Sequence, residues 1–298
     1  MNLGIDIGNQ LVKTSENIIF DARVSEIEPF VVECDVLELH GKTYYITEGA
    51  FEHKNVKFEK SNFIPLLIAA ICKSSEKVNN NVIVGLPISQ FKTHKDALKA
   101  IIDENSTLKV KWNGKNRNII IEKFDVYPEG VAIFNALNED MQKQVDKKDV
   151  LLIDIGSRTT DCCIFKYRPD GSRQLEIPNS LFVGTHNVYK EVRNAVNKQY
   201  DCRKTLEEVI QMFNTRVLLI DGEEKDLKFI NPIMINELNK IINDLELEYD
   251  LASHQLILCG GGATMMYGMF AERYPSTILL DDIFANAQGY KIIADARF

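Results

Sequence analysis

The sequence predicts an α/β protein made of two similar halves that face one another. The segment LGIDIGN at residues 3–9 resembles LLIDIGS at residues 151–157, since each reads as an apolar strand, an Asp, an Ile, a Gly and a small polar residue. Each segment also begins a strand meander that is followed by helices. A length of 298 residues leaves room for two such units, and 45% hydrophobic with 26% charged residues is ordinary for a globular chain.

The first half should contain a meander followed by alternating helices and strands. Residues 2–7 read as a strand, Gly8-Asn9-Gln10 as a turn, and residues 11–14 and 18–20 as returning strands. The other elements expected here are strands at 36–39 and 43–46, a helix at 63–77 ended by Asn79-Asn80-Asn81, a strand at 82–86 stopped by Pro87, a helix at 89–102, a hairpin of 109–112 and 118–124 around Asn113-Gly114, and a helix from Pro128 to about Gln144.

The second half repeats the meander before its helices begin. A buried strand starts at Val150, a second arm covers 161–166, and Pro169-Asp170-Gly171 turns the chain into a strand at 174–177. The elements expected after it are helices at 184–198, 203–213 and 232–246, strands at 217–220 and 255–259, a helix at 263–273, a strand at 277–280 and a helix at about 283–294.

Composition excludes several classes of protein. The net charge of −8 argues against broad, nonspecific DNA binding, although a local basic patch remains open. Six scattered cysteines without a CxxC, and five histidines without paired spacing, predict neither a zinc site nor a disulfide framework. The chain starts without a signal-peptide pattern, and its longest apolar run, 63–72, is half of the roughly 20 residues that a membrane helix needs. We therefore expect a soluble cytoplasmic protein with no membrane contact.

The first candidate site is the turn in LGIDIGNQLVKT. Asp6 ends a strand, and Gly8 permits a tight turn whose backbone N–H groups, with those of Asn9 and Gln10, can point at a phosphate. Lys13 returns along the next strand and can meet the same phosphate. The alternative is a surface hairpin with an isolated Asp.

The second candidate site is the turn in IDIGSRTTD. Asp154 can hold Mg²⁺ through water, because Mg²⁺ keeps much of its hydration shell. Asp161 lies on the returning strand and can orient a water. The alternative is a β-turn rich in Ser and Thr, but two copies of one pattern favour the functional interpretation. The turn residues that would face a phosphate are Gly156, Ser157, Thr159 and Thr160.

Two further segments carry possible chemistry. A strand runs into Gly260-Gly261-Gly262 and then, at Ala263, into a helix, an arrangement that lets backbone approach a nucleotide and offers a helix N-terminus to an anion. It is neither a dinucleotide fingerprint nor a P-loop, and a close-packed turn is the alternative. Glu129 follows a strand at an expected helix start and can position an attacking water, or simply stabilise the helix dipole.

Together these features resemble the actin-like ATPase superfamily, whose motifs they match in order over nearly the whole chain. Residues 6–13 and 154–161 resemble its two phosphate loops, and residues 260–263 its adenosine loop. Residues 127–137 and the FANAQGY segment at 284–290 resemble its two connecting segments. The resemblance implies a duplicated actin-like (ribonuclease H-like) α/β fold, with two lobes around a central nucleotide cleft.

The resemblance also implies an organisation and a set of roles. Domain I would comprise 1–149 plus about 281–298, with a small tip near 36–60, and domain II would comprise 150–280. Asp6 and Asp154 would hold Mg²⁺, mostly through water, while Glu129 and Asp161 would be catalytic and orient the lytic water. One departure is Arg158 in the second turn, where the family more usually has Gly or Thr. Its direction decides how closely that turn can wrap a phosphate.

Within the superfamily, the nearest resemblance is to the ParM-like group of plasmid-segregation filaments. It implies a bacterial ATPase that binds ATP or GTP with Mg²⁺, polymerises into nucleotide-dependent filaments and meets DNA through a DNA-binding adaptor protein. Two alternatives remain. A small-molecule kinase of the same superfold would need a substrate pocket, for which no long insertion is present. A non-hydrolysing division or pilus scaffold would not need Glu129 and Asp161.

Overall fold

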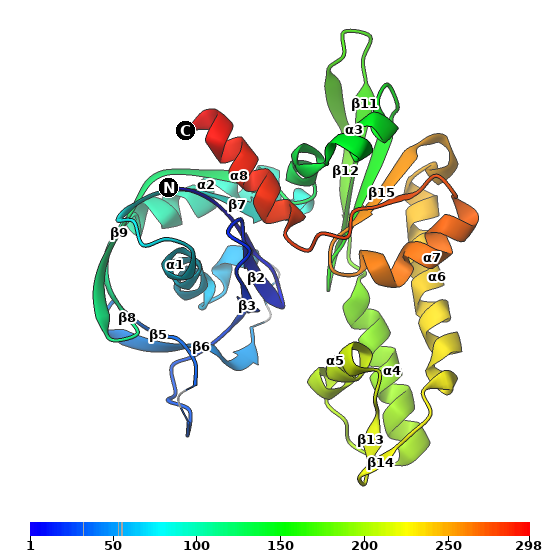
Figure 1. Ribbon diagram of the computed structural model, residues 1–298, viewed down its shortest axis with the longest axis horizontal. Helices are drawn as coiled ribbons and strands as arrows, with labels where there is room; N and C mark the ends of the chain where they lie inside the picture. The colour runs from blue at the N-terminus through cyan, green and yellow to red at the C-terminus, as the bar shows by residue number, and fades with distance from the viewer. Residues whose placement is uncertain (32, 53, 55) are drawn as a thin grey trace.

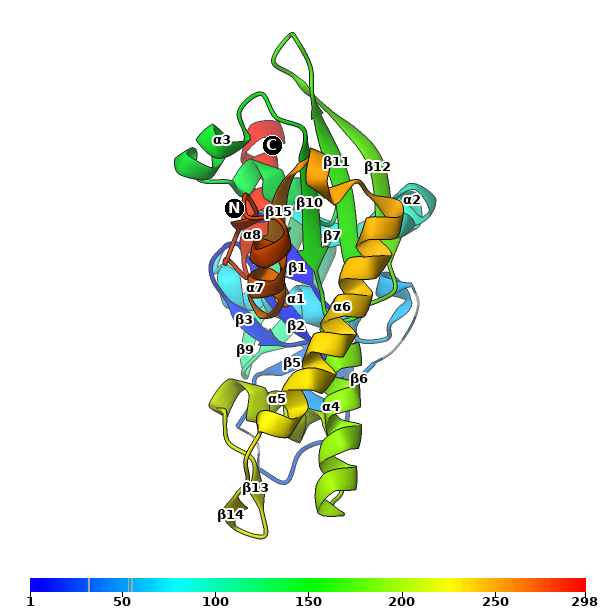
Figure 2. The same cartoon turned by 90° about the vertical axis from the view of Figure 1, so that its right-hand side faces the viewer.

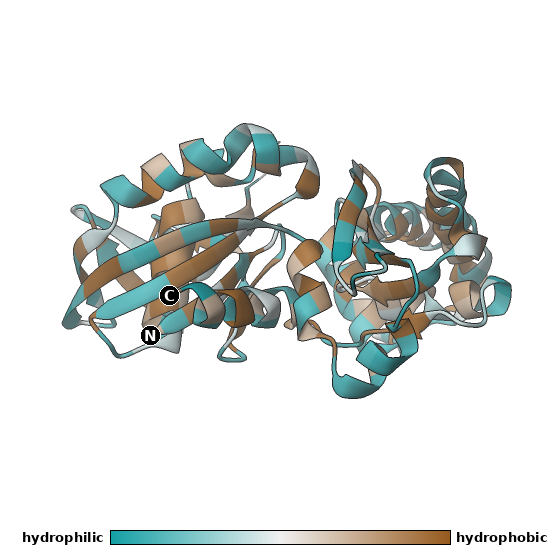
Figure 3. Cartoon of the chain, turned by 90° about the horizontal axis from the view of Figure 1, so that it is seen from above, coloured by the Kyte–Doolittle hydropathy of each residue, from teal (hydrophilic) through white to brown (hydrophobic). Residues whose placement is uncertain are grey.

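The computed structural model describes residues 1–31, 33–52, 54 and 56–298, and they form two lobes that lie side by side (Figure 1). Lobe I is built on a nine-stranded sheet and lobe II on a five-stranded sheet. Seen from above, hydrophobic residues gather inside each lobe and hydrophilic ones face outwards (Figure 3). Each lobe therefore has a core of its own.

Lobe I wraps its sheet around one helix. The sheet order is β3-β2-β1-β7-β9-β8-β5-β6-β4. Helix α1 (Phe63–Ser74) is apolar on nearly all sides, so the surrounding sheet can bury almost all of it (Figure 1). The strands are β1 (Asn2–Ile7), β2 (Leu11–Thr14), β3 (Ile19–Asp21), β4 (Arg23–Ser25), β5 (Val36–Leu39), β6 (Lys42–Phe51), β7 (Asn79–Leu86), β8 (Thr107–Trp112) and β9 (Lys115–Pro128), and the other elements are η1 (Lys57–Glu59) and α2 (Ile88–Glu104).

Lobe II packs a sheet of order β12-β11-β10-β15-β16 between two layers. Helices α4 to α7 cover one face, and in Figure 2 α6 runs obliquely in front of the sheet while α4 extends below it. The short η2 and α3 and the start of α8 cover the other. The strands are β10 (Val150–Ile155), β11 (Thr160–Tyr167), β12 (Arg173–Leu181), β15 (Gln255–Cys259) and β16 (Ile278–Leu279), with a separate hairpin of β13 (Leu219–Ile220) and β14 (Glu223–Glu224). The helices from residue 131 onwards are η2 (Val131–Ala136), α3 (Glu139–Val145), α4 (Thr185–Tyr200), α5 (Leu206–Thr215), η3 (Lys228–Ile230), α6 (Asn231–Glu248), η4 (Leu251–Ser253), α7 (Ala263–Arg273) and α8 (Ala285–Arg297).

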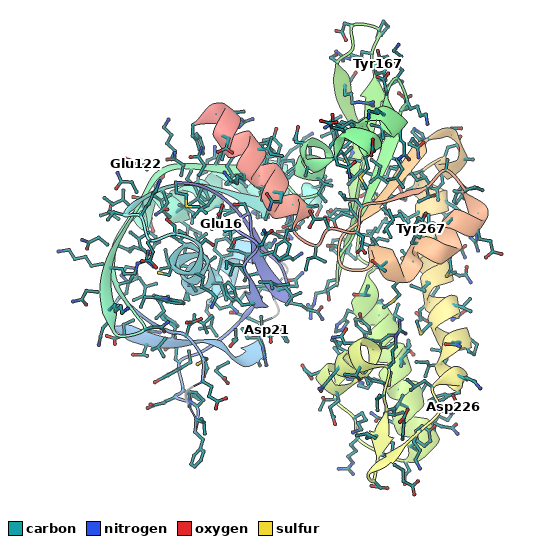
Figure 4. All side chains as sticks on the ribbon, viewed as in Figure 1. Glu16, Asp21, Glu122, Tyr167, Asp226 and Tyr267 are labelled. Atoms are coloured by element: carbon teal, nitrogen blue, oxygen red, sulfur yellow. The ribbon has the colours of Figure 1, made fainter. Side chains whose placement is uncertain are left out.

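Burial on both faces explains the apolar run at residues 150–155. All six residues of β10 are buried, as expected for a strand covered by helices on both sides. The two ends of lobe II are marked in Figure 4, where Tyr167 lies at the projecting β11–β12 hairpin and Asp226 at the opposite end. The turn between β10 and β11 lies between these two ends of the lobe.

The predicted echo between the halves is present in the strand register. In lobe I, β1 pairs antiparallel with β2 and parallel with β7, and Asp6 lies opposite Lys13. In lobe II, β10 pairs antiparallel with β11 and parallel with β15, and Asp154 lies opposite Asp161. The same seven-residue step therefore brings two side chains to one face at each turn.

Helix α8 returns to lobe I and packs on β1, β7 and η2. Gly4 permits this approach, because a Cβ there would lie 2.0 Å from the Ala287 carbonyl oxygen. The two ends of the chain consequently lie near each other (Figure 1). The domain limits, with residues 281–298 assigned to domain I, stay a prediction.

Two expected elements differ from the structure. The helix predicted from Pro128 to about Gln144 is wrong, because Pro128 pairs with Leu86 as the last residue of β9, and Gly130 takes a φ of 77° that no helix contains. Only η2 and the short α3 follow. Asn79–Asn81 do not end a helix but begin β7, because β1 and β9 supply their partners on both sides. Within the predicted tip at 36–60, residues 53 and 55 lie outside the described residues.

No helix in the described ranges is both long and apolar enough to cross a membrane.

Candidate functional site

A cleft of about 590 Å³ lies between the lobes, where the β1–β2 and β10–β11 turns face one another. Its polar lining comes from both sheets and from α8. The predicted site residues that line it are Asp6, Gly8, Asn9, Gln10, Lys13, Glu129, Asp154, Gly156, Ser157, Thr159, Asp161, Gly260 and Gly261. Residues from four separate motifs therefore meet in one place, as the resemblance implied.

Three predicted residues lie behind this lining. Thr160 is fully buried and donates its hydroxyl to the Val183 carbonyl oxygen at 2.9 Å. Gly262 donates its N–H to the Ile155 carbonyl at 2.9 Å, and Ala263 is 1% exposed. These contacts support the turns rather than face the cleft.

The first turn combines a tight backbone with an ion pair. The Gly8 N–H donates to the Leu11 carbonyl at 2.9 Å, which closes the turn. Lys13 Nζ lies 3.2 Å from Asp6 Oδ2, and both side chains are largely buried. Burial acts to raise the pKa of Asp6, but Lys13 and Lys57 outweigh it and hold that pKa below its usual value. Asp6 therefore stays ionised, as a ligand for a cation must.

The second turn repeats the backbone but places two acids together. The Gly156 N–H donates to the Thr159 carbonyl at 2.9 Å, the counterpart of the Gly8 bond. Burial, and then the nearby charge of Asp161, raise the pKa of Asp154 to about 6. Ser157 Oγ is buried and, among the described residues, has no hydrogen-bond partner. A phosphate oxygen would satisfy this hydroxyl, so the turn fits an anion.

Asp161 is held on three sides. Its carboxylate accepts from the Ser180 hydroxyl, from the Ile88 N–H at 3.3 Å and from the Thr159 hydroxyl at 3.2 Å. Burial nevertheless raises its pKa above the usual value. Ile88 begins α2 of lobe I, so Asp161 also ties the two lobes together.

The glycine at position 260 is required by a close approach. Its φ is 84°, and a Cβ there would lie 2.1 Å from Asp154 Oδ1.

Arg158, the departure noted in the second turn, is among the residues that line the cleft. Burial lowers the pKa of its guanidinium. The second turn thus presents a cation to the cleft.

Glu129 is positioned by a lysine that the motifs did not mark. Lys57, from η1, forms an ion pair with Glu129 and lies 3.7 Å from Asp6 Oδ1. Burial raises the pKa of Glu129 to about 7, while Lys57 acts in the opposite direction. A raised pKa makes the Glu129 carboxylate a stronger base, which suits a group that accepts a proton from water. No short motif contains Lys57, because its partner is 72 residues away.

Asn286 was also missed as a site residue, although it lies within the FANAQGY segment. Its Nδ2 donates to Asp154 Oδ2 at 2.8 Å, and its Oδ1 accepts the Gly130 N–H at 3.0 Å. One amide therefore connects α8, β10 and the turn after β9. The sequence did hold a signal for this role. Asn286 is a polar residue among small ones, in a segment expected at the boundary between the lobes.

Helices α4 and α5 add less polar side chains to the lining of the cleft. Tyr189 on α4, with Ile210 and Asn214 on α5, contributes an aromatic, an apolar and an amide side chain to its lining. Such a mixture suits a nucleotide base, which needs a flat apolar surface and few polar contacts. Sequence motifs gave no indication of these residues.

The acids present fit a hydrated Mg²⁺ rather than a metal bound by the protein alone. No group of three His, Cys, Asp or Glu side chains forms a metal cluster in the part of the chain that the structure describes. Asp6 and Asp154 supply two carboxylates on opposite walls of the cleft. Mg²⁺ commonly takes one or two carboxylates and fills its other positions with water and phosphate oxygens.

Two family models match the chain. The actin-like proteins N-terminal domain matches residues 4–131, and the C-terminal domain of the archaeal actin homologue MreB-like family matches residues 152–272. No curated protein matches significantly. The two matched segments contain the first and second turns respectively.

Solved structures agree with the family models. The structure of an archaeal actin homologue is 23% identical, with a TM-score of 0.82 and 99% of each chain covered. Its complex with ADP is 22% identical, with a TM-score of 0.81 and the same coverage. A ParM from Clostridium botulinum, solved as a 15-stranded filament, is 20% identical, with a TM-score of 0.86 and 99% of each chain covered. At these identities the likeness shows the fold.

Two lobes with paired turns around one cleft define an actin-like fold, and the predicted fold class is confirmed. Both matched segments correspond to domains of actin-like proteins, and ParM filaments and an archaeal actin homologue are among the structural neighbours of the chain.

Proposed function

We propose that this protein is an ATPase of the actin-like superfamily that assembles into nucleotide-dependent filaments. The observation that carries the proposal is the repeated register of the two turns. Asp6 faces Lys13 and Asp154 faces Asp161, each across a turn closed by one glycine N–H. Two such turns on opposite walls of one cleft can hold a chain of phosphates between them.

Each wall would contribute differently to phosphate binding. Backbone N–H groups of Asn9 and Gln10 and the Lys13 ammonium would hold phosphate oxygens from lobe I. The orphaned Ser157 hydroxyl and the Thr159 side chain would do so from lobe II. Gly260 and Gly261 would let the backbone lie close to the nucleoside. Hydrolysis would then depend on positioning and charge, as is usual in phosphoryl transfer.

Glu129 and Asp161 would orient the attacking water. The raised pKa of Glu129 suits it to take a proton from that water. Asp161 is held in place by hydrogen bonds from the Ser180 hydroxyl and the Ile88 N–H. Asp6 and Asp154 would hold Mg²⁺ through water. When bound, Mg²⁺ supplies the positive charge that neutralises the phosphates. We infer ATP as the substrate, since the archaeal homologue of the same fold was solved with ADP, and a GTP preference is the alternative outcome of a binding test.

The cellular part of the proposal depends on the ParM-like resemblance. A ParM of this fold forms a filament, which supports self-association here. We propose plasmid segregation in a bacterial cytoplasm, with a DNA-binding adaptor as the partner because the chain itself carries a net charge of −8. Six unpaired cysteines, four of them buried, suit the reducing cytoplasm. Domain I would be 1–149 plus about 281–298, and domain II 150–280.

Phosphate release from ATP and Mg²⁺ tests the enzyme. Glu129→Gln should bind nucleotide within about threefold of the wild type and hydrolyse it roughly 10²-fold to 10³-fold more slowly. The matched control is Glu122→Gln, an exposed residue of β9, which should hydrolyse at the wild-type rate. Equal hydrolysis by Glu129→Gln and Glu122→Gln would remove Glu129 from the mechanism.

Light scattering and electron microscopy test the polymer. We expect filaments with ATP and Mg²⁺ at micromolar protein, and their loss as ATP is consumed. Absence of polymer over a wide range of salt and protein concentration would refute the filament proposal and leave the ATPase proposal standing. ADP formation that requires an added sugar or acid, with the phosphoryl group transferred to that acceptor, would instead indicate a kinase.

A further inference from the structure

Among the described lysines that line the cleft, Lys57 is the most deeply buried. Its side chain is 6% exposed, and its ammonium lies between Glu129 and Asp6, 3.7 Å from Asp6 Oδ1. These two carboxylates belong to the turn after β9 and to β1. A buried ammonium with acidic partners of this kind is held firmly until another anion replaces one of them.

The charges around Lys57 show what such an anion would meet. Asp6, Glu129, Asp154 and Asp161 line the cleft, together with the exposed Asp282. Lys13 forms an ion pair with Asp6. Within the described residues, Lys57 is the only lysine that forms an ion pair with Glu129. A terminal phosphate that enters between these acids therefore needs the charge of Lys57. Taking that charge would loosen the bond to Glu129.

The segment that carries Lys57 is itself attached to the first turn. The Lys57 N–H donates to Gln90 Oε1 at 3.3 Å, and Lys60 Nζ donates to Asn9 Oδ1 at 2.7 Å. Lys60 is 8% exposed, and no carboxylate in the described chain lies within ion-pair distance of it. Burying an ammonium whose hydrogen-bond partner is a neutral amide is costly. An anion bound beside Lys60 would offset that cost. Lys57 and Lys60 thus place two buried ammonium groups beside the first turn.

We propose that Lys57 is a positioning residue that distinguishes a nucleoside triphosphate from a diphosphate. Without the third phosphate it holds Glu129 in an ion pair, so that the carboxylate cannot orient a water. With the third phosphate present, Lys57 changes partner and Glu129 is released to its water. This inference rests on the proposed ATPase function and adds the element that makes hydrolysis depend on the γ-phosphate.

Nucleotide affinities of Lys57→Met test this role. The probes are Mg²⁺ with ADP and Mg²⁺ with a non-hydrolysable ATP analogue, each measured by calorimetry on the full chain. We expect the affinity for ADP to stay within about twofold and that for the analogue to fall at least tenfold, as loss of a charge-assisted bond to one phosphate predicts. Lys57→Arg should recover part of the difference. The matched control, Lys73→Met, removes another lysine ion pair of lobe I and should leave both affinities unchanged.

A second variant separates a direct role from a role in folding. Lys57→Met with Glu129→Gln removes both charges of the pair, so that neither is left buried alone. If Lys57 contacts the phosphate, the double variant should bind the analogue at least fivefold more weakly than Glu129→Gln alone. Equal affinities of those two variants, or an equal fall for ADP and the analogue in Lys57→Met, would overturn the inference. A wild-type protein that binds neither nucleotide would overturn the proposed function, and this inference with it.

Discussion

Replacement of Asn286 by Ala would test how the two lobes are joined. Asn286 Nδ2 donates to Asp154 Oδ2 at 2.8 Å, and Asn286 Oδ1 accepts the Gly130 N–H at 3.0 Å. The side chain is 9% exposed, so little water reaches these bonds. Alanine removes both of them and leaves a carboxylate and an N–H without their partner.

The expected loss follows from the two bonds. A hydrogen bond to a charged group contributes about 1.5–3 kcal/mol, and a buried N–H left unpaired costs about 1–3 kcal/mol. Because water can enter part of the vacated space, we expect Asn286→Ala to lower the free energy of unfolding by about 2–4 kcal/mol. For a chain of this size the melting temperature should fall by roughly 5–15 °C.

The loss should also depend on pH. Burial raises the pKa of Asp154 to about 6, and the bond from Asn286 opposes this by favouring the carboxylate. A raised native pKa gives stability at low pH that is lost as the pH rises through that value. Removing Asn286 raises the pKa of Asp154 further, so Asn286→Ala should cost more at pH 8 than at pH 5.

Urea unfolding followed by circular dichroism, at pH 5 and pH 8, measures both effects. The control is Asn80→Ala, since the Asn80 amide is buried but donates to the backbone carbonyls of Lys77 and Val78, which do not titrate. Its loss should be the same at both pH values. A loss for Asn286→Ala below about 0.5 kcal/mol, or one independent of pH, would refute the assignment of Asn286 as the ligand of an ionised Asp154.

Three other expectations concern the same cleft and its support. Gly260→Ala should abolish nucleotide binding and lower stability, because its Cβ would lie 2.1 Å from Asp154 Oδ1 at a φ of 84°; wild-type affinity by calorimetry would contradict this. With ADP bound, Mg²⁺ affinity should fall roughly fourfold from pH 7.5 to 5.5 as Asp154, with a pKa of about 6, takes up a proton. Asp154→Asn should bind Mg²⁺ weakly without that dependence, and persistence of the same pH profile in it would assign the proton elsewhere. Thr205→Ala should cost about 1 kcal/mol, because Thr205 and Glu208 form a capping box at α5. Combining it with Glu208→Ala should then cost less than the sum of the two single losses, and strictly additive losses in urea unfolding would argue against the capping box.

Local sequence was enough to predict the two turns because their geometry is local. Asp6 and Lys13, like Asp154 and Asp161, are seven residues apart across one tight turn, and strand alternation alone places each pair on one face. The turn residues Gly8 and Gly156 could be read for the same reason. Those residues line the cleft as predicted, while their catalytic and binding roles stay predictions.

Local signals failed where the partner comes from elsewhere in the chain. Pro128 reads as the first residue of a helix, but β7 pairs with it and extends β9 instead. Asn79 to Asn81 read as a helix end, yet two neighbouring strands take them into the sheet. In both cases hydrogen bonds from distant segments outweigh the preference of the residues themselves.

The sequence by itself determined the duplicated strand-turn-strand units and the acids that they present, because short-range sterics and side-chain alternation decide both. Only the tertiary structure decided which charges meet. Lys57 reaches Glu129 across 72 residues and Asn286 reaches Asp154 across 132. Such contacts depend on how η1 and α8 pack against the lobes. Burial in that packing then sets the pKa of Glu129 and of Asp154, so the chemistry of the cleft is a property of the folded chain.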